Sequence, residues 1–269
     1  MLVDSIVRSA YTRSIERVAK RIGVHNRLLR MYYRFTISRY DTPLPGYSEP
    51  NVMHHVWNAV DSGDVFWDVG AKSGTYSKIV SFATHPAGIV AFEPNPLFFE
   101  QLERTMGQLP GSFFTQALDS ALGAQEAVKP LSVTTPEGSQ SSSGALLTEK
   151  LQSRYDGVKA VNVRVLSGDN AVTRFNVPPP SVIKIDVEGA EYEVLQGLSN
   201  TLENGTIHTI FIEIHESQAD NGPSIYDFDA SPEDVHAFLE DHGYSHEVIE
   251  NRARDYHIMA TRRKQQTGA

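Results

Sequence analysis

Two hydrophobic patterns alternate along most of this chain. Short apolar runs at 64–69, 88–93 and 112–118 predict buried strands. Between them, apolar residues at helical spacing predict helices at 75–83 and from Pro96 to about Met106, where proline suits the first turn. The first part of the chain therefore predicts strands that are connected through helices.

The second half continues the alternation after a less regular stretch, 122–166. Three consecutive prolines lead into the next apolar run, and Ser231 and Pro232, followed by two acidic residues, have the pattern of a helix start. The predicted strands lie at 128–133, 161–166, 181–186, 208–215, 245–250 and 256–261, and the predicted helices at 190–202 and from Ser231 to Gly243.

This order of elements predicts an α/β fold with a doubly wound, mostly parallel sheet that helices cover on both faces. Such sheets bind ligands at the carboxyl ends of their strands. The domain is predicted at 47–262, after a helical extension with a proline-containing linker at 1–46 and before a polar tail at 263–269. A serine-rich loop at 139–143 is interpreted as a lid over the ligand site or as a plain linker.

The charge is unevenly distributed between the extension and the domain. Residues 1–40 carry a net charge of +7 in amphipathic helical patterns, whereas the remainder carries −16, which gives −9 overall. We expect the basic segment to meet an anionic membrane surface, and the alternative is a helix that packs on the domain or forms a homodimer contact. The acidic domain argues against a nucleic-acid partner.

Several sequence features bear on the compartment. Cysteine is absent, which excludes disulfides and thiolate chemistry. No apolar run approaches the length of a membrane span, and charges interrupt the first residues too often for a signal peptide. The sequence therefore predicts a cytoplasmic protein, with peripheral contact at the inner face of the membrane as an extension of that prediction.

A turn with two glycines follows the first predicted strand. Gly70 and Gly74 allow a tight turn and a close backbone approach to a ligand, and Glu93, after the second strand, is placed to accept ribose hydroxyls. The spacing differs from the pyrophosphate-binding glycine pattern, and a carboxylate at Asp68 would repel a diphosphate but suits an amino group. S-adenosylmethionine is therefore favoured over NAD and ATP as the cofactor, and a nicotinamide-dependent oxidoreductase is the disfavoured alternative.

Acidic residues and a histidine gather at the ends of the last two central strands. Asp186 and Glu188 follow one strand, while Glu213 and His215 share one face of the next by its period of two. With an ordinary pKa of about 6.5, His215 suits a general base in this group. The sequence lacks a clear metal-ligand spacing, so we predict no metal, although such a cluster is able to hold a divalent ion.

Two further residues near these strand ends have structural interpretations. Lys184, within a central strand, needs a carboxylate partner if it is buried. Glu191 is interpreted mainly as an acidic residue that is favourable at a helix start.

Three segments together resemble the FkbM family of class I methyltransferases. They are 66–74 (FWDVGAKSG), 92–96 (FEPNP) and 183–191 (IKIDVEGAE), in that order. The resemblance implies a Rossmann-like methyltransferase fold, S-adenosylmethionine as the methyl donor and O-methylation of sugars or natural products. One position departs from the family, which commonly has asparagine where Lys72 stands, but the expected contacts in this loop are mainly through the main chain.

The resemblance also implies roles for individual residues in cofactor binding. Near the methionine moiety would lie Asp68, Gly70, Ala71, Lys72 and Gly74. The ribose would be bound by Glu93 with Asn95, and the adenine would be flanked by Ala117 and Leu118. Glu49 matches an acidic position upstream of the glycine turn, and Asp186 belongs to the cofactor site as well as to the catalytic group.

The sequence leads to one main functional hypothesis with two alternatives. The main hypothesis is methylation of a hydroxyl on a small molecule, a glycan, a lipid-linked glycan or a polyketide-like acceptor. One alternative is formation of a methyl ester on a uronic acid, where the carboxylate is already a nucleophile and needs no base. The other is a catalytically inactive module that binds S-adenosylmethionine.

Overall fold

The computed structural model describes residues 49–109, 111–133, 144–154, 159–216, 222–252 and 255–263. The chain divides into two units, 1–50 and 51–269, and nearly all described residues belong to the second. Three predicted features lie outside the described residues: the amphipathic helices of 1–40, the loop at 139–143 and the tail after residue 263.

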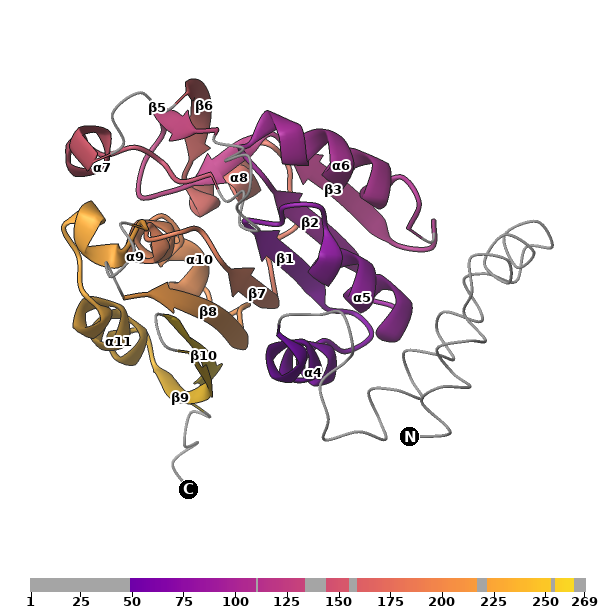
Figure 1. Ribbon diagram of the computed structural model, residues 1–269. Coiled ribbons are helices and arrows are strands. Elements are labelled where there is room, and N and C mark those ends of the chain that lie inside the picture. The colour runs from indigo at the N-terminus through magenta and orange to yellow at the C-terminus, as the bar shows by residue number, and fades with distance from the viewer. Residues whose placement is uncertain are drawn as a thin grey trace, which may run out of the picture. The chain divides into compact units, whose positions relative to one another are not determined.

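The centre of the second unit is a seven-stranded sheet with the order β3-β2-β1-β7-β8-β10-β9 (Figure 1). Its strands are β1 (Val65–Val69), β2 (Gly88–Phe92), β3 (Phe114–Leu118), β7 (Val182–Ile185), β8 (Thr209–His215), β9 (Tyr244–Asn251) and β10 (Asp255–Arg262). The five strands from β3 to β8 are parallel, while β10 pairs antiparallel with β8 and with β9. Because β2 and β7 flank β1, the strand order reverses at β1, which is where such sheets bind ligands.

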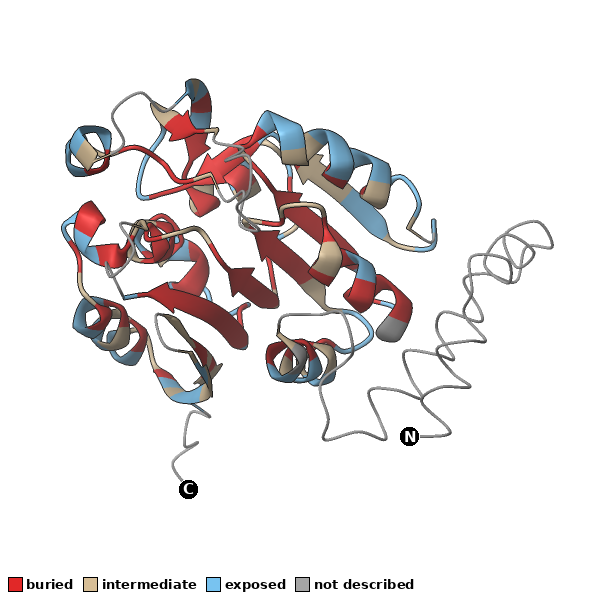
Figure 2. Ribbon diagram, viewed as in Figure 1, coloured by how far each residue is buried: buried red, intermediate tan, exposed pale blue. Residues whose placement is uncertain are grey.

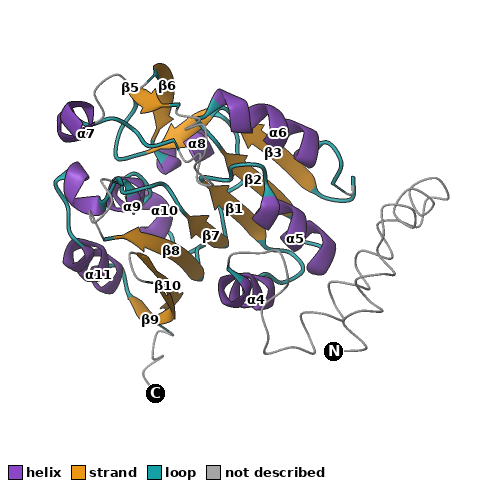
Figure 3. Ribbon diagram, viewed as in Figure 1, coloured by secondary structure: helices purple, strands orange, loops and turns teal. Residues whose placement is uncertain are grey.

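Helices lie on both sides of this sheet (Figure 3). Along the chain they are α4 (Pro50–Ala59), α5 (Thr75–Ala83), α6 (Pro96–Met106), α8 (Gly168–Arg174), α9 (Glu191–Gln196), α10 (Ser199–Glu203), η1 (Ile225–Phe228) and α11 (Pro232–Asp241). The predicted cap of α11 is confirmed, since Ser231 and Asp234 form a reciprocal capping box. The prediction of a doubly wound, mostly parallel α/β fold is confirmed.

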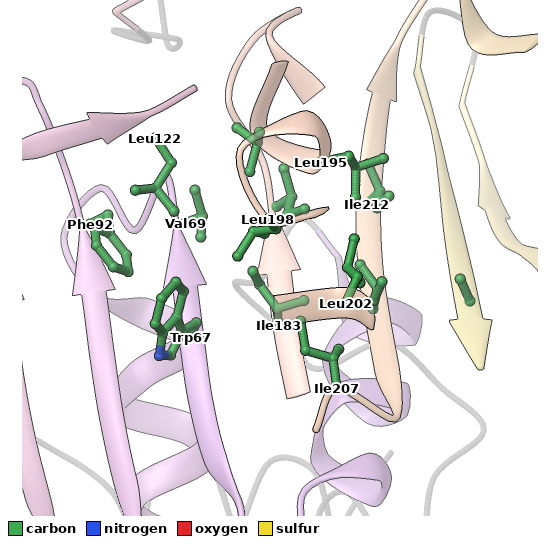
Figure 4. Close-up of a cluster of buried hydrophobic side chains, with 14 of the residues drawn as sticks. Trp67, Val69, Phe92, Leu122, Ile183, Leu195, Leu198, Leu202, Ile207 and Ile212 are labelled. Carbon is green, nitrogen blue, oxygen red and sulfur yellow. The ribbon is translucent and has the colours of Figure 1, made fainter. Parts of the chain in front are cut away.

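The main hydrophobic core lies against the face of the sheet that α8 to α11 cover. Alternate residues of β1, Trp67 and Val69, enter this core together with Ile183 of β7. Figure 4 shows these side chains converging with those of the helices, and Figure 2 shows that the central strands are buried along their length. Because side chains alternate along a strand, Asp68 and Lys184 lie on the opposite face, toward α5.

A smaller, three-stranded sheet occupies the region that the sequence leaves irregular. It has the order β4-β6-β5, with β4 (Ser120–Leu122), β5 (Ala127–Ser132) and β6 (Ala160–Leu166), and α7 (Glu149–Arg154) accompanies it. Its own core cluster includes Leu131, Leu146 and Leu151. The strand-like pieces predicted at 128–133 and 161–166 are β5 and β6, whereas β4 is a strand that the sequence pattern did not indicate.

The single helix predicted at 190–202 is wrong, because the segment forms two helices, α9 and α10. Gly197 lies between them, and a Cβ there would come within 2.1 Å of the backbone oxygen of Gly123. This close approach requires glycine, and the chain turns so that Leu198 enters the core fully buried. Among the described residues, no helix is long and apolar enough to span a membrane.

Truncation of Leu198 tests the importance of this turn. Leu198→Ala is expected to lower the free energy of unfolding by about 2–5 kcal/mol, because it leaves a cavity in a fully packed core. The matched control is Leu97→Ala, since Leu97 is 54% exposed, and its effect should stay below about 0.5 kcal/mol. Chemical denaturation measures both, and equal stability of the two variants would contradict the packing described here.

Candidate functional site

The turn after β1 contacts the ends of two neighbouring strands. The backbone N–H groups of Gly70 and Ala71 both donate to the carbonyl oxygen of Phe92, at 3.0 Å. Gly70 has a φ of +78°, and a Cβ on it would lie 1.8 Å from the backbone oxygen of Asp186. Only glycine fits this position, so the turn brings the carboxyl ends of β1, β2 and β7 into contact.

Glu93 follows β2 and is 4% exposed. Its two carboxylate oxygens accept hydrogen bonds from the backbone N–H groups of Lys72 and Asn95, each at 2.8 Å. Burial raises the pKa of Glu93 to about 7, although both hydrogen bonds oppose the shift. The carboxylate is thus oriented from both sides and becomes ionised near neutral pH.

Two other predicted cofactor residues have supporting positions. Asp68 points toward α5, where its Oδ2 accepts hydrogen bonds from the backbone N–H of Ser77 at 3.0 Å and its hydroxyl at 2.7 Å. Asn95 caps α6, since its side chain accepts from the backbone N–H of Leu97. Both side chains stabilise the loops that shape the site, and neither lines the pocket described next.

A pocket opens at the reversal of strand order, where such sheets bind ligands. The predicted residues that line it are Gly70, Lys72, Glu93, Asp186 and Glu188. The remaining wall is largely apolar and consists of Val69, Phe92, Pro94, Phe98, Ser120, Ala121, Leu122, Leu131, Gly144, Leu146, Val187 and Ala190. One side of the pocket is therefore charged, and the other suits a flat, apolar group.

Part of this wall was not predicted from the sequence. Ala117 and Leu118, expected beside an adenine, do not line the pocket, and Leu118 belongs to the core. The short strand β4 takes that place. Leu131 belongs to β5 of the smaller sheet, and Leu146 forms an isolated β-bridge with it, so both reach the pocket only through long-range packing.

The remaining predicted cofactor residues, Ala71, Gly74 and Glu49, do not line the pocket. Ala71 and Gly74 shape the turn behind the pocket, where Gly74 has a φ of +81° and precedes α5. Glu49 belongs to the unit of residues 1–50, so its part in cofactor binding stays a prediction.

Asp186 is the most strongly charge-paired group of the site. The ammonium of the buried Lys184 lies 3.0 Å from its Oδ2, and that of Lys72 lies 4.0 Å away. Burial would raise the pKa of Asp186, but these two cations hold it well below its usual range. The prediction that Lys184 needs a carboxylate partner is confirmed. Asp186 Oδ1 is buried and accepts no hydrogen bond from any residue that the structure describes, and Nε2 of His215 lies 3.9 Å from it.

His215 lies among three carboxylates. Its Nδ1 is 2.7 Å from Oε1 of Glu191, and its Nε2 is 3.5 Å from Glu188 and 3.9 Å from Asp186. Burial alone would lower the pKa of His215, yet these charges, that of Glu191 above all, raise it well above its ordinary value. The expectation of an ordinary pKa is therefore wrong, since the surrounding carboxylates favour the protonated form of the histidine.

Glu191 has a larger role than its position at a helix start indicated. It is fully buried, and its Oε1 also accepts a hydrogen bond from the backbone N–H of Gly189 at 2.8 Å. Glu191 is thus fixed beside His215 by the tight turn between Asp186 and α9. The sequence carried little signal for this pairing, because 24 positions separate the two residues.

Glu213 completes the group on the same face of β8 as His215. Single ligand atoms of Asp186, Glu213 and His215 lie within 4.8 Å of one another, an arrangement able to hold a metal ion. Glu213 also lies 3.3 Å from His257 and 3.6 Å from Arg252. Burial and Asp186 would raise the pKa of Glu213, but the hydrogen bond from His257 and the charges of both histidines lower it. Glu213 and His215 lie behind Asp186 and do not line the pocket.

Comparison with known proteins gives a consistent result. Residues 68–245, more than half of the chain, match the family described as Methyltransferase FkbM domain. The hexuronic acid methyltransferase AglP of Haloferax volcanii is 31% identical over 217 residues, which cover 78% of this chain and 76% of that protein.

Solved structures are more distant. A methyltransferase FkbM from Methylobacillus flagellatus KT has a TM-score of 0.49 at 12% identity and covers 86% of this chain and 50% of that one. A precorrin-6y C5,15-methyltransferase from Geobacter metallireducens GS-15 has a TM-score of 0.45 at 16% identity and covers 84% of this chain and 95% of that one.

Replacement of Glu191 tests the origin of the raised pKa of His215. Glu191→Gln is expected to lower that pKa toward about 6.5, because it removes the nearest negative charge. Titration of the histidine ring protons by NMR measures it. The control is Glu193→Gln on the same helix, whose carboxylate pairs with Lys129 at 2.8 Å.

The same pairing predicts how stability depends on pH. A raised folded-state pKa contributes stability that is fully present below the unfolded value of about 6.5 and is lost as the pH rises through the folded value. This loss should shrink in Glu191→Gln. An unchanged His215 titration in that variant would contradict the assignment.

Proposed function

Because the chain belongs to the FkbM methyltransferase family, we propose that it is an S-adenosylmethionine-dependent enzyme that methylates the carboxylate of an acidic sugar in a glycan. The observation that carries the choice of acceptor is the position of His215, the side chain expected to be the base: it does not line the pocket, and carboxylates face both of its ring nitrogens, at 2.7 and 3.5 Å. A hydroxyl needs a base when it attacks, whereas a carboxylate is already an anion. The related protein from Haloferax volcanii is named for hexuronic acid, an acidic sugar.

The residues around the pocket fit the proposed cofactor. S-adenosylmethionine supplies a methyl group bonded to a positively charged sulfur. Glu93 is oriented to accept ribose hydroxyls, and the apolar wall from Phe92 to Leu146 suits the adenine. Asp186 holds a buried negative charge at this edge of the sheet, which would stabilise a positive charge or an amino group of the cofactor.

Cationic side chains of the protein already neutralise two carboxylates of the site. The carboxylates of Asp186 and Glu213 have the cations of Lys184 and Arg252 beside them, at 3.0 and 3.6 Å. A divalent ion among these residues would be repelled by those cations. We therefore propose that methyl transfer proceeds by alignment of acceptor and donor and by exclusion of water, without a metal.

The pKa of Glu93 gives a test of cofactor binding. The affinity for S-adenosylhomocysteine should fall as the pH decreases from about 8 to about 6, because the carboxylate is lost near pH 7. Glu93→Gln should bind about 10–100-fold more weakly and lose this pH dependence, since one charged acceptor of ribose hydroxyls is removed. Calorimetric titration measures both.

The control is Glu100→Gln, because Glu100 lies on α6 with a side chain that is 66% exposed. It should behave as the wild type. A Glu93 variant with full affinity would remove the ribose assignment.

The chemical stability of the product distinguishes the possible acceptors. With a methyl-labelled donor and a glucuronate-containing oligosaccharide, the label is expected in the glycan and should be released as methanol by mild alkali, because methyl esters are hydrolysed under these conditions. The same oligosaccharide with its acid reduced to an alcohol is the control and should stay unlabelled.

The other outcomes identify the alternatives. A label that resists alkali, or a labelled reduced control, would indicate an ether formed on a hydroxyl. Binding of S-adenosylhomocysteine without transfer to either glycan would favour the inactive module.

A further inference from the structure

Lys72 has an unusual backbone conformation for its residue type. Its φ is +50°, in the left-handed region that favours glycine and asparagine. Lysine is uncommon in this conformation, and the side chain is 43% exposed where it lines the pocket. A strained residue at the rim of a pocket points to use of its side chain.

Lys72 is the more distant of the two lysines that pair with Asp186. Lys184 already lies 3.0 Å from Asp186, whereas Lys72 is 4.0 Å away. The nearest partner of Lys72 is instead Glu188, at 3.2 Å, which also lies 3.5 Å from His215. Glu188 therefore lies between Lys72 and His215. Lys72 would be able to leave Glu188 and pair with the carboxylate of a ligand, because Glu188 would keep its contact with His215.

We propose that the side chain of Lys72 binds the carboxylate of the acceptor and thereby selects an acidic sugar over a neutral one. This inference rests on the proposed function. A lysine ammonium is a compact charge on a flexible stem, so it is able to move from Glu188 to an incoming anion at the pocket rim. The main chain of the same residue meanwhile holds Glu93 through the 2.8 Å hydrogen bond.

The proposal is consistent with the chemistry of ester formation. An ammonium on one carboxylate oxygen leaves the other oxygen to attack. That oxygen forms a bond to the methyl carbon while the carbon–sulfur bond breaks, and the bonding electron pair stays on sulfur. No proton is released. The ester is neutral, so Lys72 loses its attraction to the product and returns to Glu188, which favours product release.

Substitution by asparagine tests this role without changing the backbone preference. Asparagine tolerates a positive φ and lacks the charge, so Lys72→Asn should retain the loop. The enzyme, saturated with S-adenosylhomocysteine, is titrated with a glucuronate-containing trisaccharide and with the same trisaccharide reduced to the alcohol. The wild type should bind the acid about tenfold more tightly than the alcohol.

The variants should separate the side-chain charge from the loop. Lys72→Asn should lose the preference for the acid, Lys72→Arg should keep most of it, and the affinity of all variants for S-adenosylhomocysteine should stay within about twofold. The control is Lys150→Asn, since Lys150 has a similar exposure of 51% and an ion pair with Asp229. It should retain the wild-type preference.

Two results would overturn the proposal. If Lys72→Asn keeps the preference for the acid, or loses cofactor affinity instead, Lys72 does not select the acceptor, whereas the proposed function stands. If the wild type itself does not distinguish acid from alcohol, the acidic-sugar acceptor is wrong and the role of Lys72 falls with it.

Discussion

The buried ion pair between Lys184 and Asp186 is the constraint on which the site depends. A carboxylate at the reversal of strand order, 7% exposed, is tolerated only with a close cation, and Lys184 supplies it at 3.0 Å from within the same segment. Removal of one partner from such a pair typically costs about 3–5 kcal/mol. The pair keeps a negative charge at the carboxyl edge of the central strands, around which Lys72 and His215 are arranged.

The two faces of the sheet have different roles, one in the stability of the fold and the other in the chemistry of the site. Trp67, Val69 and Ile183 face the large core under α8 to α11. The residues between them, Asp68 and Lys184, face α5, where Ser77 holds the first and the ring of Tyr76 lies under the second, 4.5 Å from its ammonium. Because strand side chains alternate, the same short segments supply both a dry core and a row of charged groups.

The surroundings of His215 change the chemistry that this cluster supports. A histidine with an ordinary pKa beside a substrate would act as a base, but Glu191 is 2.7 Å away and raises the pKa of His215. Of the cations at this edge, Lys72 lines the pocket, and an ammonium there would suit an anionic acceptor better than a neutral one. The proposed preference for a carboxylate over a hydroxyl rests on these side-chain contacts and not on the residue types alone.

Local sequence patterns were sufficient to predict the strands of the central sheet, the glycine turn at Gly70 and the placement of Glu93 and Asp186 at strand ends. These features follow from local patterns: runs of apolar residues, glycines where φ is positive, and polar residues at strand ends. Other features required the tertiary structure. It shows that β4, Leu131 and Leu146 contribute to the pocket wall, that Asp68 accepts a hydrogen bond from Ser77, and that Glu191 contacts His215. It also placed Lys72 beside Glu188, 116 positions away in the chain. Such contacts depend on how distant segments pack, and a pKa depends on those contacts, so neither is encoded in the pattern around a single residue.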